Sequence, residues 1–312
     1  MYPIRRLPDD LIVSEGLTAK QIKRQDVGWD EIDLQLDKAF GRENENRCPI
    51  FIADTGLPEH PDIPKAQEAW NFTDDPSVVD LNFHSTWING KMTAYNNDIG
   101  YEGICPEDTP VFILKVLNNQ GSGWRMLQAM RKALDFWVNH PKRRSGEWVA
   151  AVYNMSYGGG GYSQDEQILF KDMIKENILP FAASGNEGRS APSFPAKYEG
   201  VLSVGAYDPQ REKASFTNYG PWTDFVAPGV NVPSTIGKNK YGPYSGTSMA
   251  CPIKAACAAN FISSRPNDKW MHDVPGYQEA VQPYMENLPG TWDGDGVFLP
   301  AKGTVRNKYF FW

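Results

Sequence analysis

The sequence has little cysteine and histidine and no long apolar run. It contains four cysteines and four histidines in 312 residues. No stretch approaches the ~18 consecutive apolar residues of a membrane helix, and the first ten residues lack the apolar segment of a secretory signal. We therefore expect no membrane association and a cytoplasmic location. The cysteines show no metal-type spacing and are expected to be free thiols in a reducing compartment: Cys48, Cys105, Cys251 and Cys257.

The chain also lacks an excess of positive charge. It has 31 Lys and Arg against 38 Asp and Glu, for a net charge of −7. This balance gives no electrostatic footprint for nucleic acid or for an anionic membrane. The densest basic run, Lys142 to Arg144, is interpreted as a solvated loop. With 41% hydrophobic and 22% charged residues, the composition is that of a folded protein with a sizeable core.

Short apolar runs alternate with amphipathic segments from about residue 48 onward. Continuous apolar runs are typical of strands whose two sheet faces are both buried, and they occur at 49–53, 111–117, 148–155, 179–183, 201–206 and 224–227. Between them, apolar residues recur at helical spacing and predict core-facing stripes: Trp124, Leu127, Met130, Leu134 and Trp137, then Ile168, Met173 and Ile174. The pattern predicts an α/β protein with a parallel sheet covered by helices.

One large domain with two divergent ends is the expected organisation. Residues 1–24 are charged and without a strong period, which indicates an extension of the main body, residues 25–312. Arg265 to Asp268 ends a helix, and residues 265–312 are rich in proline, glycine and aromatics.

Four polar residues are candidates for chemistry, and each alone has an ordinary structural alternative. Asp54 ends a predicted strand, where α/β proteins gather catalytic groups, but it is also suited to capping that end. His84 is either a base or a structural histidine. Asn186 follows another strand, as an oxyanion donor or a turn residue. Ser248 lies at the start of a helix whose first turn accommodates Pro252, as a nucleophile or an N-cap.

In chain order, Asp54, His84, Asn186 and Ser248 lie within segments that resemble those of subtilisin-like serine proteases, and the layout is most similar to the intracellular subtilisins. The resemblance covers Gln25 to Ile262. It is carried by residues 54–62, 84–90, 96–106, 154–159, 183–188 and 246–252. It implies a three-layer subtilisin-like fold, mainly a parallel sheet flanked by helices.

The resemblance also implies the roles of the four residues. Ser248 would attack a peptide carbonyl, His84 would take its proton, and Asp54 would orient the imidazole. The side chain of Asn186 and the backbone amide of Ser248 would bind the oxyanion. The implied function is that of a serine endopeptidase with broad specificity, acting on proteins or peptides.

Substrate-binding residues follow from the same resemblance. Residues 156–159 would pair with an extended peptide by added β pairing and wall the main specificity pocket. Glu187 and Ser193 would form the base and rim of that pocket, and Trp124 with Arg125 the wall of a more distant apolar subsite. The substrate-binding set is Ser156, Tyr157, Gly158, Gly159, Glu187, Ser193 and Trp124.

A structural calcium ion is the implied cofactor. Six oxygens suit Ca²⁺, and the similar site in the family draws them from side chains and from loop carbonyls. The side chains would be those of Gln25, Asp62 and Asn97, and the carbonyls those of Tyr95, Ile99 and Tyr101. The alternative is an asparagine-rich turn without metal.

Two further expectations concern regulation and assembly. Ile4 to Pro8 loosely resembles the short inhibitory extension of intracellular subtilisins, which predicts that residues 1–24 lie across the cleft until cleaved. Intracellular relatives also suggest a homodimer.

The chain departs from the family pattern near the base and beyond the nucleophile. Ser85 and Trp87 replace the usual glycine and histidine, and Ile253 and Lys254 replace the usual His-Val pair. A bulky indole beside the base could tilt His84. The alternative function is therefore a catalytically impaired pseudoprotease that acts as a structural or binding protein.

Overall fold

A seven-stranded parallel sheet forms the centre of the molecule. The computed structural model describes residues 4–7, 11–12, 17–18, 28–30, 47–191, 193–264, 290–292 and 298–300. The strands of the sheet are β4 (Ile50–Asp54), β5 (Glu68–Asn71), β6 (Val111–Lys115), β8 (Ala151–Met155), β9 (Ile178–Ala183), β10 (Leu202–Tyr207) and β11 (Phe225–Pro228). Their order is β11-β10-β9-β8-β4-β6-β5, and every neighbouring pair is parallel.

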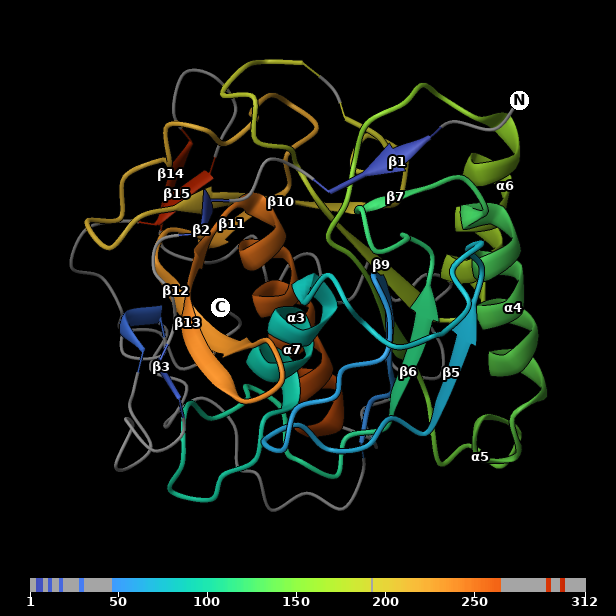
Figure 1. Cartoon of the computed structure of the whole chain (residues 1–312). Helices are drawn as coiled ribbons and strands as arrows, with labels where there is room; N and C mark the ends of the chain where they lie inside the picture. The colour runs from blue at the N-terminus through green and yellow to red at the C-terminus, as the bar shows by residue number, and fades with distance from the viewer. Residues whose placement is uncertain are drawn as a thin grey trace.

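Helices cover both faces of this sheet. They are α3 (His84–Thr93), α4 (Met126–Asn139), α5 (Pro141–Arg144), α6 (Gln164–Lys175) and α7 (Thr247–Ser264). Figure 1 shows α3 and α7 side by side on one face and α4 and α6 on the other. The predicted three-layer α/β architecture is therefore confirmed.

The period-two arrangement of a strand assigns side chains to the two cores. On β4, Ile50 and Ile52 lie in the core beneath α3 and α7, whereas Phe51 and Ala53 lie in the core beneath α4 and α6. All four are fully buried. Burial on both faces explains why these strands are continuous apolar runs in the sequence.

Three details of the sequence prediction were wrong. Trp124 and Ile168 are 41% and 50% exposed and do not face the core, because Trp124 precedes α4 and Ile168 lies on the outer face of α6. Pro252 is not in the first turn of its helix, since α7 already begins at Thr247. Strand β5 was not predicted, because the edge segment Glu68–Asn71 is short and contains no apolar run.

Smaller sheets attach the N-terminal segment to the main body. Strands β12 (Val232–Ile236) and β13 (Lys240–Ser245) form an antiparallel pair that β2 (Leu11–Ile12) and β3 (Leu17–Thr18) extend. Strand β1 (Arg5–Arg6) pairs with β7 (Ser122–Gly123). Thus all three N-terminal strands pair with the body. Strands β14 (Gly290–Trp292) and β15 (Phe298–Pro300) pair with each other, and the other predicted features of residues 265–312 lie outside the described residues.

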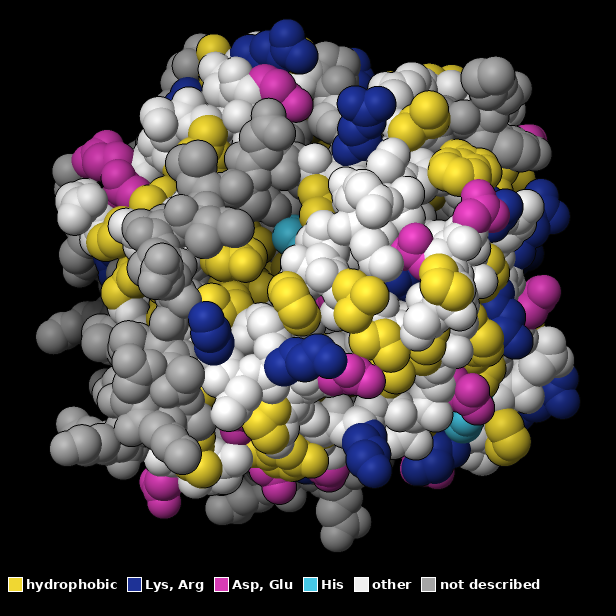
Figure 2. Space-filling view, viewed as in Figure 1, with side chains coloured by type: hydrophobic (Ala, Val, Ile, Leu, Met, Phe, Trp, Pro, Cys, Tyr) yellow, Lys and Arg dark blue, Asp and Glu magenta, His cyan; other side chains and the backbone are white. Residues whose placement is uncertain are grey.

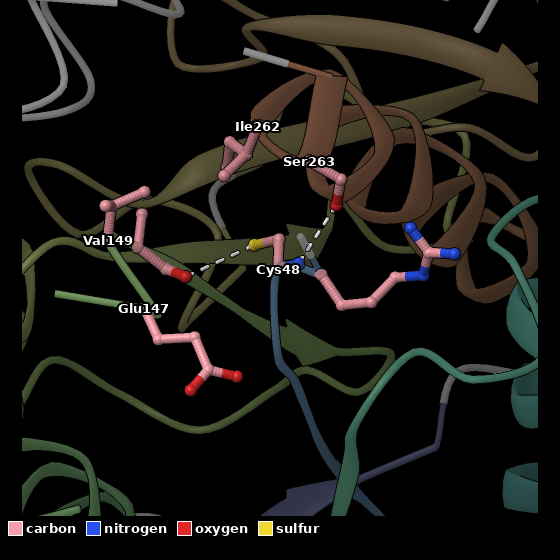
Figure 3. Close-up of a pocket in the computed structure, with 7 residues that line it drawn as sticks. Cys48, Glu147, Val149, Ile262 and Ser263 are labelled. Carbon is pink, nitrogen blue, oxygen red and sulfur yellow. Dashed lines mark hydrogen bonds between the residues drawn. The ribbon is translucent and has the colours of Figure 1, made fainter. Parts of the chain in front are cut away.

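A small pocket lies at the end of the sheet opposite Asp54. Figure 3 shows Cys48, Val149 and Ser263 around it, from the segments that precede β4 and β8 and from the last turns of α7. The Cys48 N–H donates to Ser263 Oγ at 2.9 Å. The pocket is therefore separate from the candidate chemistry at the carboxyl ends of the strands.

Surface charge is mixed on the face shown in Figure 2. Acidic and basic side chains are interspersed over its described part, and hydrophobic side chains gather between them. Among the described helices, none is both long and apolar enough to cross a membrane.

Candidate active site

The carboxyl end of β4 brings an aspartate and a histidine into contact. Asp54 is its last residue, His84 is the first residue of α3, and the two are 30 residues apart in sequence. Asp54 Oδ1 lies 2.8 Å from His84 Nδ1, with both side chains buried. A carboxylate can only accept, so Nδ1 carries the proton and Nε2 is the basic nitrogen. The Thr55 N–H donates to the same Oδ1 at 2.7 Å, which fixes the carboxylate.

Asp80 holds the beginning of α3 in place, and sequence reasoning missed it. Its Oδ1 accepts from the Phe83 N–H at 2.9 Å, and its Oδ2 accepts from the Thr86 N–H at 2.8 Å. Thr55 Oγ1 donates to Asp80 at 2.8 Å and accepts from the Ser85 N–H at 3.0 Å. Burial raises the pKa of Asp80, while these hydrogen bonds act in the opposite direction. An aspartate four residues before His84 was the available signal, because it is suited to capping a helix start.

The candidate nucleophile is the second residue of α7 and is joined to the strand segment at Ser156. Ser248 Oγ donates to the Ser156 carbonyl at 3.0 Å, and Ser156 Oγ donates to the Ser248 carbonyl at 3.0 Å. Pro252 has no N–H for the carbonyl of Ser248 four residues earlier, so Ser156 supplies the missing donor. The proline inside α7 thus links the nucleophile to the predicted substrate-pairing strand.

Asn186 lies against the same helix start. Its Oδ1 accepts from the backbone N–H of Thr247 at 2.9 Å and from Thr247 Oγ1 at 2.8 Å. The backbone N–H can only donate, which assigns the oxygen end of the amide and makes the other end a donor. Gly185 adopts φ +106°, and a Cβ there would come within 2.4 Å of the Asn218 side chain. The turn that presents Asn186 therefore requires glycine.

The N-terminal strand lies between two backbone segments beside this site. Arg6 donates its N–H to the Gly158 carbonyl at 3.0 Å and accepts from the Gly158 N–H at 2.9 Å. On its other side β1 pairs antiparallel with β7, and the Leu7 N–H donates to the Gly121 carbonyl at 3.0 Å. An extended peptide that pairs with residues 156–159 is the arrangement predicted for a substrate, and the pairing of its other edge with β7 was not predicted.

Two of the other predicted substrate-binding residues, Ser193 and Trp124, adjoin the segments that pair with this strand. Ser193 Oγ accepts from the Gly159 N–H at 3.1 Å, and Tyr157 is buried. Glu187 accepts from the side chain of Asn218, and its N–H donates to Asn218 Oδ1 at 3.1 Å. Trp124 directly follows β7, with the Arg125 guanidinium 5.4 Å from its ring centroid.

The predicted calcium loop contains a buried carboxylate. Asp62 is 2% exposed, and its Oδ1 accepts from Asn97 Nδ2 at 2.9 Å. Its Oδ2 is buried and makes no hydrogen bond of ordinary geometry. Burial raises the pKa of Asp62 to about 6, although the Tyr241 phenol interacts with this carboxyl group and acts to lower the pKa. The carbonyls of Tyr95, Ile99 and Tyr101 belong to the same loop, while Gln25 lies outside the described residues.

This arrangement fits a hard cation. A buried carboxylate oxygen without a donor is costly unless it is paired or bound to metal. Among the described residues no cluster of three or more His, Cys, Asp or Glu occurs. The predicted ligands contain one such residue, Asp62, and otherwise offer amide and carbonyl oxygens, which Ca²⁺ accepts.

The two substitutions beside His84 leave its contact with Asp54 in place. Trp87 is fully buried in the core beneath α3 and α7 and stacks on Tyr244 at a centroid distance of 6.4 Å. Ser85 is also buried. The indole is thus accommodated on the core side of α3, which does not favour an impaired site.

Comparison with known proteins places the chain in a family. A model of the Subtilase family matches residues 48–286. A thermostable alkaline protease of Halalkalibacterium halodurans is 36% identical over 244 residues, which are 78% of this chain and 64% of that protein. Subtilisin BL of Lederbergia lenta is 34% identical over 247 residues, 79% of this chain and 87% of that protein. A thermophilic serine proteinase of Bacillus sp. (strain AK1) is 37% identical over 246 residues, 78% of this chain and 57% of that protein.

The match thus spans less than two thirds of the first and third of these relatives and most of the second. The range matched by the family model, residues 48–286, includes the whole central sheet, Asp54, His84, Asn186 and Ser248. The resemblance inferred from the sequence is confirmed: the chain belongs to the Subtilase family of subtilisin-like serine endopeptidases.

Proposed function

We propose that this chain hydrolyses peptide bonds, with Ser248 as nucleophile, His84 as general base and Asp54 as its orienting partner. The observation that carries this function is the buried Asp54–His84 hydrogen bond of 2.8 Å. It holds the proton on Nδ1, so Nε2 is available to take the proton of Ser248 and to deliver it to the leaving amine. Asp54 stabilises the imidazolium that forms.

The oxyanion would be stabilised at the start of α7. The first N–H groups of a helix have no partner within the helix, and the helix dipole is positive there. The Ser248 N–H and the Asn186 side-chain amide would donate to the developing charge. The two hydrogen bonds from Thr247 to Asn186 hold that amide before substrate arrives, which is the preorganisation that catalysis requires.

Extended peptides are the substrate class that the site supports best. The backbone of Gly158 makes two hydrogen bonds to Arg6, and backbone groups of β7 pair on the opposite edge. Because main-chain pairing is independent of side chains, it favours broad specificity. Hydrolysis of a chromogenic tetrapeptide amide tests the function. We expect turnover by the full-length chain and by Arg6→Pro, and none above background by Ser248→Ala, whereas rates in both of the first two proteins equal to that of Ser248→Ala would refute it.

The same pairing supports an inhibitory role for the N-terminal segment. A strand that occupies both edges of the substrate path excludes a substrate from it. Arg6→Pro removes the N–H that donates to Gly158 and should therefore raise the rate of peptide cleavage. Lys65→Met changes an exposed residue and serves as the control. An unchanged rate in Arg6→Pro would refute inhibition.

A structural Ca²⁺ ion is the cofactor that we propose. Asp62 and Asn97 would hold it together with the loop carbonyls of Tyr95, Ile99 and Tyr101, and with Gln25. When bound, the ion supplies charge compensation for Asp62 and fixes this loop. It takes no part in proton transfer.

We also propose that the protein acts in a reducing, cytoplasmic compartment. The four cysteines are buried and form no disulfide, which supports thiols rather than a disulfide framework. A homodimer stays a prediction, which sedimentation of the full-length chain would test.

A further inference from the structure

The side chain of Arg5 fills a buried, acidic pocket beside the substrate path. Arg5 is fully buried, although its neighbour Arg6 is exposed. Its guanidinium forms an ion pair with Glu166, whose side chain is 3% exposed. It also donates to the carbonyls of Gly159 and Gly161 and to the hydroxyl of Tyr198. The guanidinium thus meets a carboxylate, two carbonyls and a phenol.

The protein builds this pocket without contributions from the N-terminal segment. Glu166 lies in the first turn of α6 and accepts from Tyr198 OH at 2.7 Å. The rings of Phe170 and Phe194 pack against Tyr198 at centroid distances of 5.3 and 4.7 Å. Burial is the larger cause and the hydrogen bond to Glu166 the second cause of a raised pKa of Tyr198. The phenol therefore keeps its proton and acts as a hydrogen-bond donor. Glu166 is therefore held in position by the body of the protein.

With Arg5 in place the Glu166 carboxylate is buried and has Tyr198 as a neutral donor, so its counter-charge comes from the cation. Removing the partner of a buried ion pair costs far more than an exposed pair contributes. If Arg5 leaves during activity, Glu166 keeps Tyr198 as a donor but loses its counter-charge. An arginine of the substrate would restore both the charge and the planar donor geometry that a carboxylate prefers.

Backbone register tells which substrate residue would enter the pocket. Arg6 pairs antiparallel with Gly158, and a substrate residue in its place would put the substrate residue two positions later opposite Ser156, whose carbonyl contacts Ser248 Oγ. A substrate on the same path therefore presents its scissile carbonyl two residues after the position of Arg6. The position of Arg5 becomes the fourth residue before the scissile bond.

We propose that Glu166 and Tyr198 form a specificity pocket that selects arginine at the fourth residue before the scissile bond. This deepens and rests on the proposed peptidase function. It narrows, at one position, the broad specificity that backbone pairing supports. It also differs from the apolar distant subsite that the sequence suggested, because the pocket contains a buried glutamate.

Two acetylated tetrapeptide p-nitroanilides of sequence Xaa-Ala-Leu-Phe test this selection. Xaa is arginine in one and citrulline, its neutral isostere, in the other. With the full-length chain we expect kcat/KM for the arginine peptide to be larger by on the order of 10–100-fold. The N-terminal segment competes equally with both peptides, so the ratio does not depend on how often it occupies the site.

Variants identify the carboxylate responsible. In Glu166→Gln the ratio of kcat/KM between the arginine and citrulline peptides should fall below about threefold. Asp165 is an exposed carboxylate on the same helix, and Asp165→Asn should leave this ratio unchanged. Equal kcat/KM values for the two peptides in the unaltered chain, or an unchanged ratio in Glu166→Gln, would overturn the pocket while leaving peptide hydrolysis established. Cleavage of neither peptide, also in Arg6→Pro, would refute the peptidase function and this inference with it.

Discussion

The burial of Lys254 should lower the free energy of unfolding, and the size of this loss should depend on pH. Lys254 lies on α7, is 2% exposed, and has its Nζ 5.5 Å from the ring centroid of Phe225. Burial lowers the pKa of Lys254 from its ordinary 10.5 to about 8, because removing an ammonium from water disfavours the charged form. The folded chain therefore binds this proton more weakly than the unfolded chain does.

The sign and size of the effect follow from linkage. Between about pH 8 and pH 10.5 the unfolded state holds more protons at this position, so the free energy of unfolding rises with pH in that window. Below pH 8 the penalty is complete. A pKa difference of this size corresponds to about 3 kcal/mol. Lys254→Met keeps an unbranched side chain and removes the charge, so it should raise the unfolding free energy by up to about 3 kcal/mol at pH 7.

Urea unfolding at pH 7 and pH 10 measures this effect. Both proteins carry Ser248→Ala so that self-cleavage does not interfere. The gain from Lys254→Met should be large at pH 7 and small at pH 10. The exposed Lys65→Met should change stability by less than about 0.5 kcal/mol at either pH. An equal gain at the two pH values, or a loss at pH 7, would refute the assignment of the penalty to the buried ammonium.

Three other perturbations test the site. Asn186→Leu should lower kcat by roughly 10²–10³-fold with little change in KM, because one oxyanion donor is lost; a change confined to KM would contradict this role. Asp80→Ala should lower the unfolding free energy by about 1–3 kcal/mol, because the N–H groups of Phe83 and Thr86 lose a buried acceptor, and should lower kcat/KM through His84; full activity would show that Asp80 does not position the base. Chelation with EDTA should lower the Tm of the Ser248→Ala protein. It should leave the Tm of the double variant Ser248→Ala, Asp62→Ala unchanged, whereas equal Tm shifts in the two proteins would refute the proposed ion site.

Much of the central sheet was predictable because its strands are buried on both faces. The apolar runs around Ile50 and Val111 identify strands without reference to their neighbours. The edge strand Glu68–Asn71 was not predictable in this way, because it is short and contains only two consecutive apolar residues. The helical spacing wrongly assigned Trp124 and Ile168 to the core, because periodicity does not tell where a helix begins or which apolar residue faces outward.

The candidate catalytic set was predictable as an ordered pattern, but its supporting contacts were not. Asp54, His84, Asn186 and Ser248 lie in recognisable motifs. Their supports come from elsewhere, through pairings that no local pattern indicates: Asp80 accepts from the start of α3, Thr55 bridges two carboxylates, and Ser156 supplies the donor that Pro252 lacks. The acidic pocket was not predicted for the same reason. Glu166 lies in the first turn of α6, where acidic residues are common because they stabilise the helix dipole.

Labelling with a fluorophosphonate probe tests the central claim most directly, because it reports the nucleophile without a choice of substrate. The full-length chain, Arg6→Pro and Ser248→Ala would be treated in the presence of calcium, and the adduct located by mass spectrometry. We expect a single adduct on Ser248, more rapid in Arg6→Pro and absent from Ser248→Ala. No adduct on Ser248 in either of the first two proteins would contradict a working Asp54, His84 and Ser248 site.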